Sequence, residues 1–220
     1  MAKYITLLLA ILCSFAGFRA HSYEAADSLS GKYLFLHLPG DALQLIPEST
    51  RVDMVDYYEA GQKYRPLNSL RGYCSLDSLT ASYARVTVSA ASDVQMCVLP
   101  CGKQRVAAVV YTVDGGDSPD SQLLFYDADL REQPLKRYFK EPELEAFMVK
   151  SKEARAMQQL VPFLLVSYEL EPSSTGATLT ARLNVEGSMT EEDFARIKPF
   201  IATESLIYTW DGHRFSLPRK

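Results

Sequence analysis

The chain has 220 residues, of which 47% are hydrophobic and 23% charged, and its formal net charge at pH 7 is −4. These proportions are those of an ordinary globular protein, and the length suits one large domain or two small ones. An acidic chain without a basic run is poorly suited to neutralising phosphates, which argues against a nucleic-acid partner and against an anionic membrane surface.

The first twenty residues have the pattern of a secretory signal peptide. Lys3 gives a short positive start, and an uncharged apolar run follows over residues 4–18. This run is shorter than the ~20 apolar residues of a membrane-spanning helix and fits a signal sequence, with cleavage after Ala16 or Ala20. We therefore expect residues 21–220 to be exported to the periplasm or cell envelope, with no transmembrane segment after signal removal.

Cysteine usage leaves two alternatives open. Cys13 leaves with the signal peptide, and lipid attachment there is disfavoured because the bulky Leu12 precedes it where lipoprotein processing requires a small residue. The remaining Cys74, Cys97 and Cys101 are an odd number for an oxidising compartment. They are either one disulfide with one free thiol, or three small buried side chains.

Helical signals come first along the chain. The polar segment 21–32 is expected to be an unstructured lead-in, and a short helix is expected over 42–46. Thr50 with Asp53 three residues later is the pattern of a capping box, and it predicts a second helix that ends at Gly61.

The middle of the chain has the pattern of strands. Four segments with strand-like patterning, separated by short polar links, lie at 83–89, 93–99, 106–113 and 121–127. In 83–89, Arg85 and Thr87 fall on the face opposite the apolar residues. Because strands that are neighbours in sequence usually pair, we expect a four-stranded antiparallel meander.

The C-terminal half is expected to have the order ββαββ. Helix-prone segments at 141–147 and 151–160 are followed by strands at 163–171 and 177–185, a capping box at Thr190 and Asp193, and a hairpin closed by Asp211-Gly212. The strand 177–185 is polar on one side, so helices should cover only the other face of the sheet. The predicted fold class is α+β, as a single domain over 21–220 or as two tightly joined lobes meeting near 130–150.

Several segments, in their order along the chain, resemble a known family. They are residues 38–39, 51–58, 68–72, 89–96, 120–127 and 208–212. Together they resemble a family of secreted Bacteroidales proteins classed only as a domain of unknown function, over about residues 35–217. The resemblance implies an exported envelope or periplasmic protein, and it brings no activity and no catalytic residues.

No catalytic motif is evident, since the sequence contains neither G-x-S-x-G nor a glycine-rich phosphate loop, and no cofactor is expected. Asp114, Asp117 and Asp120 offer the oxygen ligands that calcium prefers, but their spacing is not that of an EF-hand, so a solvated loop is favoured over a metal site. Asp53 and Asp56 lie one helical turn apart and are candidates for acid–base chemistry, although a structural role is favoured.

Tyrosines are numerous in this chain and are the remaining candidates for a binding role. Tyr57, Tyr58, Tyr64 and Tyr73 cluster around the second helix and the loop after it. Exposed tyrosines stack on sugars or anchor protein partners, whereas buried ones are ordinary core residues.

The leading hypothesis is a non-catalytic binding or scaffold protein of the periplasm or cell envelope, with an unknown envelope protein or glycan as its partner. The alternatives are an envelope hydrolase with dispersed carboxylates, and an inhibitor or assembly partner that uses a sheet edge or the tyrosine-rich region.

Overall fold

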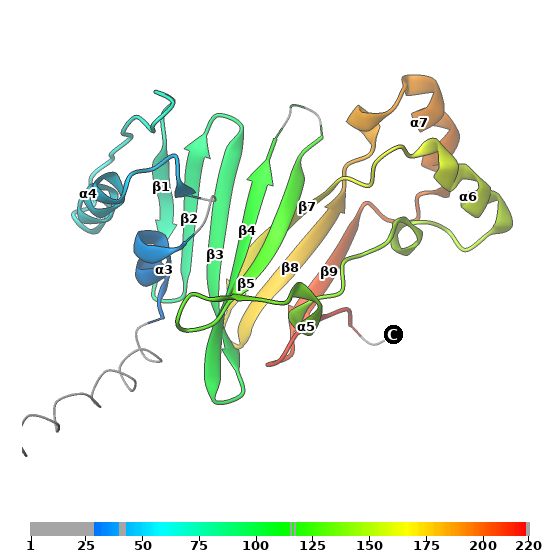
Figure 1. Cartoon of the computed structure of the whole chain (residues 1–220). Coiled ribbons are helices and arrows are strands. Elements are labelled where there is room, and N and C mark those ends of the chain that lie inside the picture. The colour runs from blue at the N-terminus through cyan, green and yellow to red at the C-terminus, as the bar shows by residue number, and fades with distance from the viewer. Residues whose placement is uncertain (1–28, 40–42, 115, 117, 219–220) are drawn as a thin grey trace, which may run out of the picture.

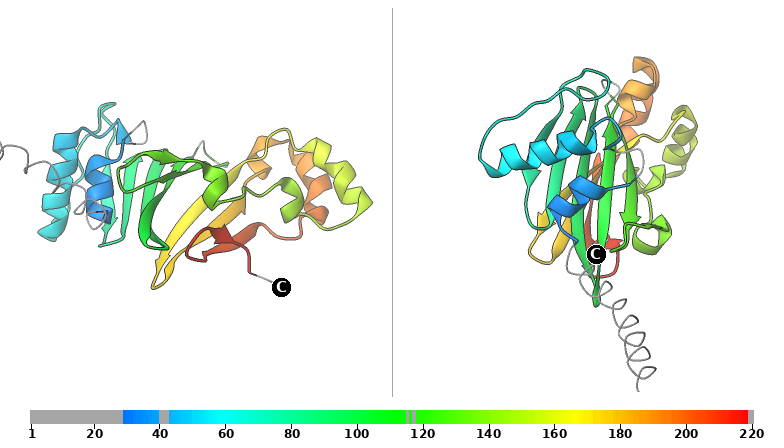
Figure 2. Two further views of the ribbon diagram at one scale, coloured as in Figure 1. Left: turned by 60° about the horizontal axis from the view of Figure 1, so that its bottom comes forward. Right: turned by 60° about the vertical axis from the view of Figure 1, so that its left-hand side comes forward.

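Two antiparallel sheets packed face to face form the centre of the protein (Figure 1). This computed structural model describes residues 29–39, 43–114, 116 and 118–218. Two helices lie against the larger sheet at one end of the molecule, and further helices follow the smaller sheet at the other end (Figure 2). The α+β class predicted from the sequence is confirmed.

The larger sheet is a six-stranded meander in which each strand pairs with its neighbours in the chain. Its strands, in spatial order, are β1 (Ser75–Leu79), β2 (Tyr83–Ser89), β3 (Ser92–Cys101), β4 (Gln104–Val113), β5 (Asp120–Tyr126) and β6 (Glu132–Gln133). The predicted four-stranded meander is confirmed as β2–β5. The added edge strands lack a sequence signal, because β1 has only two apolar residues and β6 is two residues long.

The smaller sheet comes from the C-terminal half and has the order β10-β9-β8-β7. One hairpin joins β7 (Val166–Ser173) to β8 (Gly176–Leu183), and another joins β9 (Ser205–Trp210) to β10 (Phe215–Ser216). Between them lies α7 (Glu191–Ile197), whose N-cap Thr190 accepts a hydrogen bond from the backbone N–H of Asp193 at 3.1 Å. The predicted ββαββ order and this capping box are confirmed.

Short helical segments connect the two sheets. They are α5 (Leu135–Tyr138), η3 (Leu144–Phe147), α6 (Lys152–Met157) and η4 (Gln158–Leu160), with η5 (Glu186–Ser188) and η6 (Lys198–Phe200) on either side of α7. The helix expected in 151–160 is confirmed, and Ser151 caps it by accepting from Ala154 N at 3.0 Å. The segment 141–147 forms only a single 3-10 turn. None of the helices in the described ranges is long and apolar enough to cross a bilayer.

Two helices, α3 (Gly31–His37) and α4 (Glu48–Glu59), precede the strands. Ser30 caps α3 by accepting from Tyr33 N at 3.0 Å, so the last residues of the predicted lead-in 21–32 belong to a helix; residues 21–28 lie outside the described residues. The capping box predicted at Thr50 is wrong, because α4 starts after Pro47 and Thr50 lies in its first turn; the fixed φ of proline already suits a helix start. The expected helix 42–46 lies partly outside the described residues, and its remainder forms a turn.

Side chains of the larger sheet are buried on both faces. On β3, Met96 belongs to the core beneath α3 and α4, whereas Cys97 belongs to the core between the two sheets. Helices therefore cover one face of the larger sheet, and the smaller sheet covers the other with residues such as Leu179 and Trp210. The expectation that helices would cover the apolar face of strand 177–185 is wrong, because that face packs on another sheet. Such long-range pairing of faces leaves no local pattern in the sequence.

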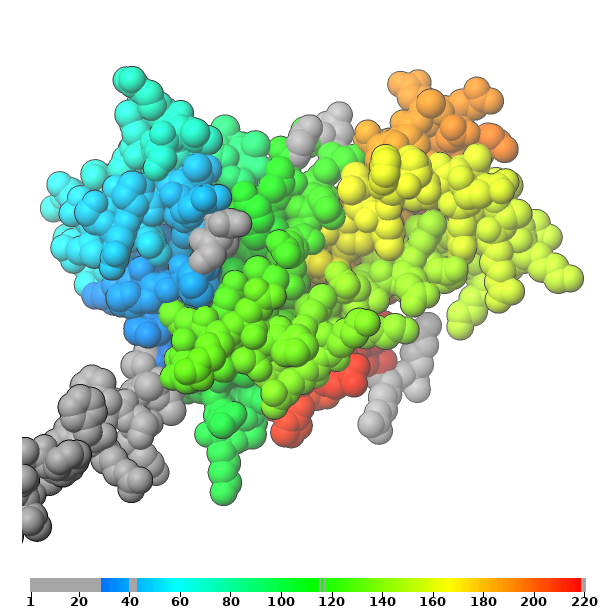
Figure 3. Space-filling view, viewed as in Figure 1, coloured from blue at the N-terminus to red at the C-terminus, as the bar shows by residue number. Residues whose placement is uncertain are grey.

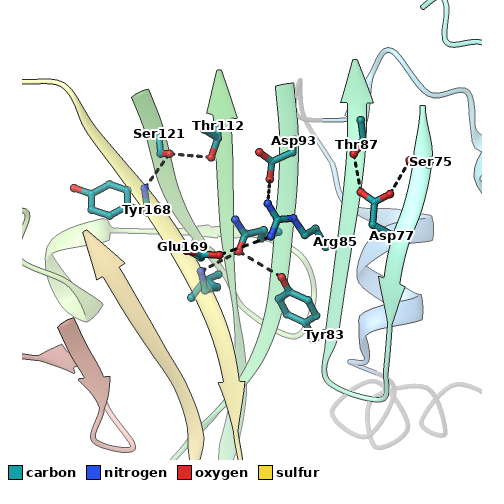
Figure 4. Close-up of polar contacts among 12 residues, drawn as sticks. Ser75, Asp77, Tyr83, Arg85, Thr87, Asp93, Thr112, Ser121, Tyr168 and Glu169 are labelled. Atoms are coloured by element: carbon teal, nitrogen blue, oxygen red, sulfur yellow. Dashed lines mark hydrogen bonds and ion pairs between the residues drawn. The ribbon is translucent and has the colours of Figure 1, made fainter. Parts of the chain in front are cut away.

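β7 is an edge strand, yet side chains of the larger sheet complete its backbone hydrogen bonds. Three alternate N–H groups donate to side-chain oxygens across the sandwich: Val166 to Asp120 at 3.1 Å, Tyr168 to Ser121 at 3.0 Å and Leu170 to Gln95 at 2.9 Å. Figure 4 shows the contact between Ser121 and Tyr168. Alternate N–H groups point to the same edge of a strand, so this edge is satisfied within the protein. Gln95 is 2% exposed, and water cannot replace its bond.

The three cysteines are separated by the layers of the fold. Cys74 lies in the core beneath the helices and Cys97 in the core between the sheets, while Cys101 is half-buried at the end of β3. Four residues of one strand span about 13 Å, whereas disulfide-linked Cα atoms lie within about 7 Å of each other. All three are free thiols, so the disulfide considered from the sequence is not formed.

Replacing Gln95 by methionine removes the acceptor for Leu170 N while keeping the length of the side chain. A buried N–H without a partner costs roughly 1–3 kcal/mol, and we expect Gln95→Met to lower the free energy of unfolding by that amount. Urea denaturation measures the change. Gln122→Met is the matched control, because Gln122 is exposed on β5 of the same sheet. Equal stabilities of the two variants would contradict a role for Gln95 at the β7 edge.

Thiol reactivity separates the three cysteines. Burial raises the pKa of the Cys97 thiol to about 12 and also raises that of Cys74, so both form the reactive thiolate less readily than an ordinary cysteine. We expect iodoacetamide to modify Cys101 first in the native protein, and Cys74 and Cys97 only after unfolding. Peptide mass spectrometry without reduction reads out the sites. A disulfide-linked pair of peptides, or rapid modification of Cys97, would contradict the arrangement.

Candidate functional site

A groove runs beside β1, between this edge strand and the chain that leaves α4. Gly61, with φ +67°, turns the chain at the end of α4, and Figure 2 shows it arching back toward the sheet. The groove has a volume of about 750 Å³. We call it the β1 groove; it is lined by Met54 and Tyr58 of α4, by Gly61, Gln62, Lys63, Tyr64 and Arg65, by Ser75, Leu76 and Asp77 of β1, and by Thr87 of β2.

The side chain of Asn68 anchors the loop that joins the two groove-lining segments, residues 61–65 and β1. Its Nδ2 donates to Val88 O at 2.8 Å, and its Oδ1 accepts from Leu70 N at 2.9 Å and from Gly72 N at 3.0 Å. Asn68 is 5% exposed, so these bonds are shielded from water. The loop is therefore fixed to the end of β2 by buried contacts.

Asp77 lies on the sheet side of the β1 groove, where the pairing register of β1 shifts by one residue. Its carboxylate accepts from Ser75 Oγ at 2.6 Å and from Thr87 Oγ1 at 2.7 Å (Figure 4). Such a bulge re-aims a side chain and twists the edge of a sheet. The two hydroxyls hold the carboxylate in place and satisfy both of its oxygens.

The predicted tyrosine cluster is gathered here, but its members have different positions. Tyr58 and Tyr64 line the groove. Tyr57 supports Tyr64 by stacking, with ring centroids 4.3 Å apart and planes 14° from parallel. Tyr73 lies outside the lining and is 62% exposed, with the Arg65 guanidinium 5.7 Å from its ring centroid. Burial raises the pKa of Tyr64, and the charge of the nearby Asp53 adds to this.

Exposed apolar side chains are concentrated around this groove. Half of the large hydrophobic residues exposed in the described part of the chain lie on α4 or in the loop before β1: Val52, Tyr57, Tyr58, Leu67, Leu70 and Tyr73. The space-filling view shows these N-terminal helices and the loop after α4 as one end of the molecule (Figure 3). Exposed apolar groups gathered in one region are typical of an interaction surface.

The charges around the groove are unequal. Lys63 and Arg65 contribute two cations to its wall, and neither makes an ion pair with another described residue. Asp77 is the one acidic residue in the lining, and its charge offsets one of these two cations. The β1 groove therefore has a net positive charge on an acidic protein, and local attraction for an anionic group follows.

The carboxylates considered for catalysis are not brought together. Asp53 and Asp56 are exposed on α4 and do not line the groove. Asp114 accepts from Gly116 N at 2.9 Å, Asp120 accepts from Val166 N, and Asp117 lies outside the described residues. Within the described ranges, no three His, Cys, Asp or Glu side chains form a group that could hold a metal ion. Asp114 and Asp120 therefore have structural roles, and Asp53 and Asp56 face solvent.

A second polar cluster, which the sequence analysis did not single out, lies where the smaller sheet leaves the larger one uncovered. A guanidinium nitrogen of Arg85 lies 3.7 Å from Asp93 Oδ1 and another lies 3.8 Å from Glu169 Oε1 (Figure 4). Arg182 Nη2 lies 3.7 Å from Glu169 Oε2. Burial raises the pKa of Asp93, and Arg85 partly offsets this. Contacts of this length between partly exposed groups stabilise little. The cluster joins the two sheets and contains no nucleophile with an adjacent base. In the sequence, only the alternation of polar and apolar residues in β2 indicated that Arg85 lies on a polar face.

The comparisons with known proteins agree with this fold and leave the chemistry open. A domain of an uncharacterized protein from Porphyromonas gingivalis W83, a member of the Bacteroidales, has a similar structure, with a TM-score of 0.69 and 24% sequence identity over 86% of this chain and 100% of that chain. No curated protein matches the chain. Residues 25–215 match the family described as "Protein of unknown function (DUF3256)". The family resemblance seen in the sequence is thus confirmed: the chain belongs to the DUF3256 family.

Proposed function

We propose that this protein is an exported, non-catalytic binding protein of the periplasm or cell envelope, and that it binds its partner in the β1 groove. The observation that carries the proposal is the coincidence of three features at one place. A groove of about 750 Å³, exposed tyrosines and unpaired cations all lie beside the edge strand β1. Binding sites are concave surfaces that combine aromatic side chains with a few polar groups in this way.

The proposed export rests on the residues before the described part of the chain. Lys3 and the uncharged run 4–18 have the pattern of a signal peptide. The hydrolase alternative has no comparable support, because Asp53 and Asp56 are exposed and do not line the groove. The binding hypothesis therefore stands as the preferred one.

Export predicts a processed N-terminus. When the full chain is expressed in a Bacteroidales host, we expect the mature protein in the periplasmic or envelope fraction, beginning at Gly17 or His21. Intact-mass measurement and N-terminal sequencing of the fractionated protein check this. An unprocessed chain that remains in the cytoplasm would contradict the proposal of export.

Binding in the β1 groove predicts site-specific crosslinking. A photo-crosslinking benzoylphenylalanine in place of Tyr58 should attach to a defined partner in intact cells, because this side chain lines the groove. The same probe in place of Phe163, which is 69% exposed outside the groove, is the matched control. We expect one discrete adduct from the Tyr58 position that the additional substitution Tyr64→Ala reduces. Adducts of equal yield from both positions, or none from Tyr58, would contradict this assignment.

A further inference from the structure

The backbone of β1 is open toward the groove. β1 is the first strand of the six-stranded sheet and pairs only with β2. Cys74 N donates away from β2, to Pro66 O at 2.9 Å. Because N–H groups of alternate residues point to the same edge, the N–H of Leu76 also points away from β2. Leu76 lines the groove and packs in the core beneath the helices, so its outward N–H lies at the boundary between that core and the groove.

The chain's own strand pairing stops just before this point. Asn68 N donates to Gly72 O at 2.7 Å, and with the Cys74–Pro66 bond this forms a short antiparallel pairing around the bridge between Leu67 and Tyr73. If this antiparallel pairing continued in the same direction, residues 61–65 would pair with β1. They diverge instead, and the β1 groove is the space left between them and the strand.

The other edges of the two sheets offer no such template. The N–H groups on the outer edge of β7 are bound by Asp120, Ser121 and Gln95. The remaining edge strands, β6 and β10, are two residues long. An extended chain that adds to a sheet needs a row of unpaired main-chain groups, with pockets for alternate side chains beside it. In the described part of the chain, β1 is the one edge strand longer than two residues whose outer main-chain groups no side chain binds, and the groove lies beside it.

The charges of the groove indicate the chemistry of the occupant. Lys63 and Arg65 lie on the wall opposite β1, and these two cations outnumber Asp77, the one carboxylate of the lining. An acidic side chain would therefore be attracted, while Tyr58 and Tyr64 offer aromatic surface for an apolar one. A second copy of this chain, paired β1 to β1 about a twofold axis, would bring the same cations to both walls. A foreign acidic segment suits the groove better.

We propose that the β1 groove binds an extended polypeptide segment with acidic and apolar side chains, which adds to β1 as an extra strand. This inference rests on the proposed function, for which it names the class of partner. Main-chain hydrogen bonds to β1 provide affinity, and the contacts of alternate side chains with Lys63, Arg65 and the tyrosines provide specificity.

A phage-displayed library of random heptapeptides, selected on the mature protein, tests the inference. We expect enriched sequences that alternate acidic and apolar residues. A synthetic copy of the best peptide should protect the Leu76 amide from hydrogen exchange. N-methylation of alternate peptide nitrogens should weaken binding by about tenfold or more, because it removes main-chain donors. Failure to enrich peptides, or equal binding of the N-methylated copy, would overturn strand addition.

Charge variants test the acidic preference. Lys63→Glu combined with Arg65→Glu should weaken the selected peptide by about tenfold or more, as measured by fluorescence anisotropy. Lys150→Glu combined with Lys152→Glu is the matched control, since these exposed residues have the same spacing and the same change of charge outside the groove. Equal losses in the two double variants, or a dimer of the free protein that competes with the peptide, would overturn the inference.

The crosslinked partner separates this inference from the function on which it rests. A Tyr58 adduct that glycosidases leave intact, and whose proteolytic digest contains peptides of a second protein, supports the polypeptide partner. An adduct that glycosidases digest keeps the proposed binding function and overturns the polypeptide as its partner. The absence of any adduct from Tyr58, with selected peptides still binding β1, would contradict binding in the cell and leave the strand-addition chemistry supported.

Discussion

Unpaired main-chain groups at the edges of sheets are the constraint on which the rest of this structure depends. A sandwich of two open sheets has four edges, and each must be satisfied, shortened or covered. At β7 the protein satisfies the edge with side chains of the opposite sheet, through Gln95, Ser121 and Asp120. The indole N–H of Trp210 adds a further bond between the sheets, to Pro100 O at 2.6 Å. These polar contacts therefore lie at the boundary of the core between the two sheets.

The β1 edge is managed differently. It is short, it contains a bulge, and a carboxylate stands at that bulge. All three features hinder indiscriminate pairing between sheets. They also leave a groove in which the remaining main-chain groups are reached only past Lys63, Arg65 and the tyrosines. One set of features can therefore protect the edge from aggregation and restrict it to a particular partner.

Local sequence signals predicted those parts of the fold that depend on local interactions. The capping box at Thr190 and the Asp211-Gly212 turn act within a few residues, and each lies where it was expected. The capping box at Thr50 failed because Pro47 supplies a competing helix start three residues earlier. The packing of the two sheets was not predictable in this way, since it depends on which apolar faces meet across the fold.

The candidate site likewise has one part that the local sequence could predict and another part that it could not. The tyrosines could be predicted as a group because they are close together in the sequence, and Tyr58 and Tyr64 do line the groove. Asp77 and Thr87 come together only through strand pairing, so neither could be linked to the tyrosines beforehand. The disulfide expectation rested on cysteine number alone, and the faces of the sheet separate Cys74 from Cys97.

Native-state amide hydrogen exchange of the free protein tests the central claim most directly, because it compares the two edges in one experiment. The Leu170 amide donates to Gln95 in a buried environment, whereas the Leu76 amide points into the open β1 groove. We expect the Leu170 amide to exchange slowly, near the rate set by global unfolding, and the Leu76 amide to exchange much faster. Equal protection of the two amides would show that the β1 edge is already closed within the protein, and would contradict the account.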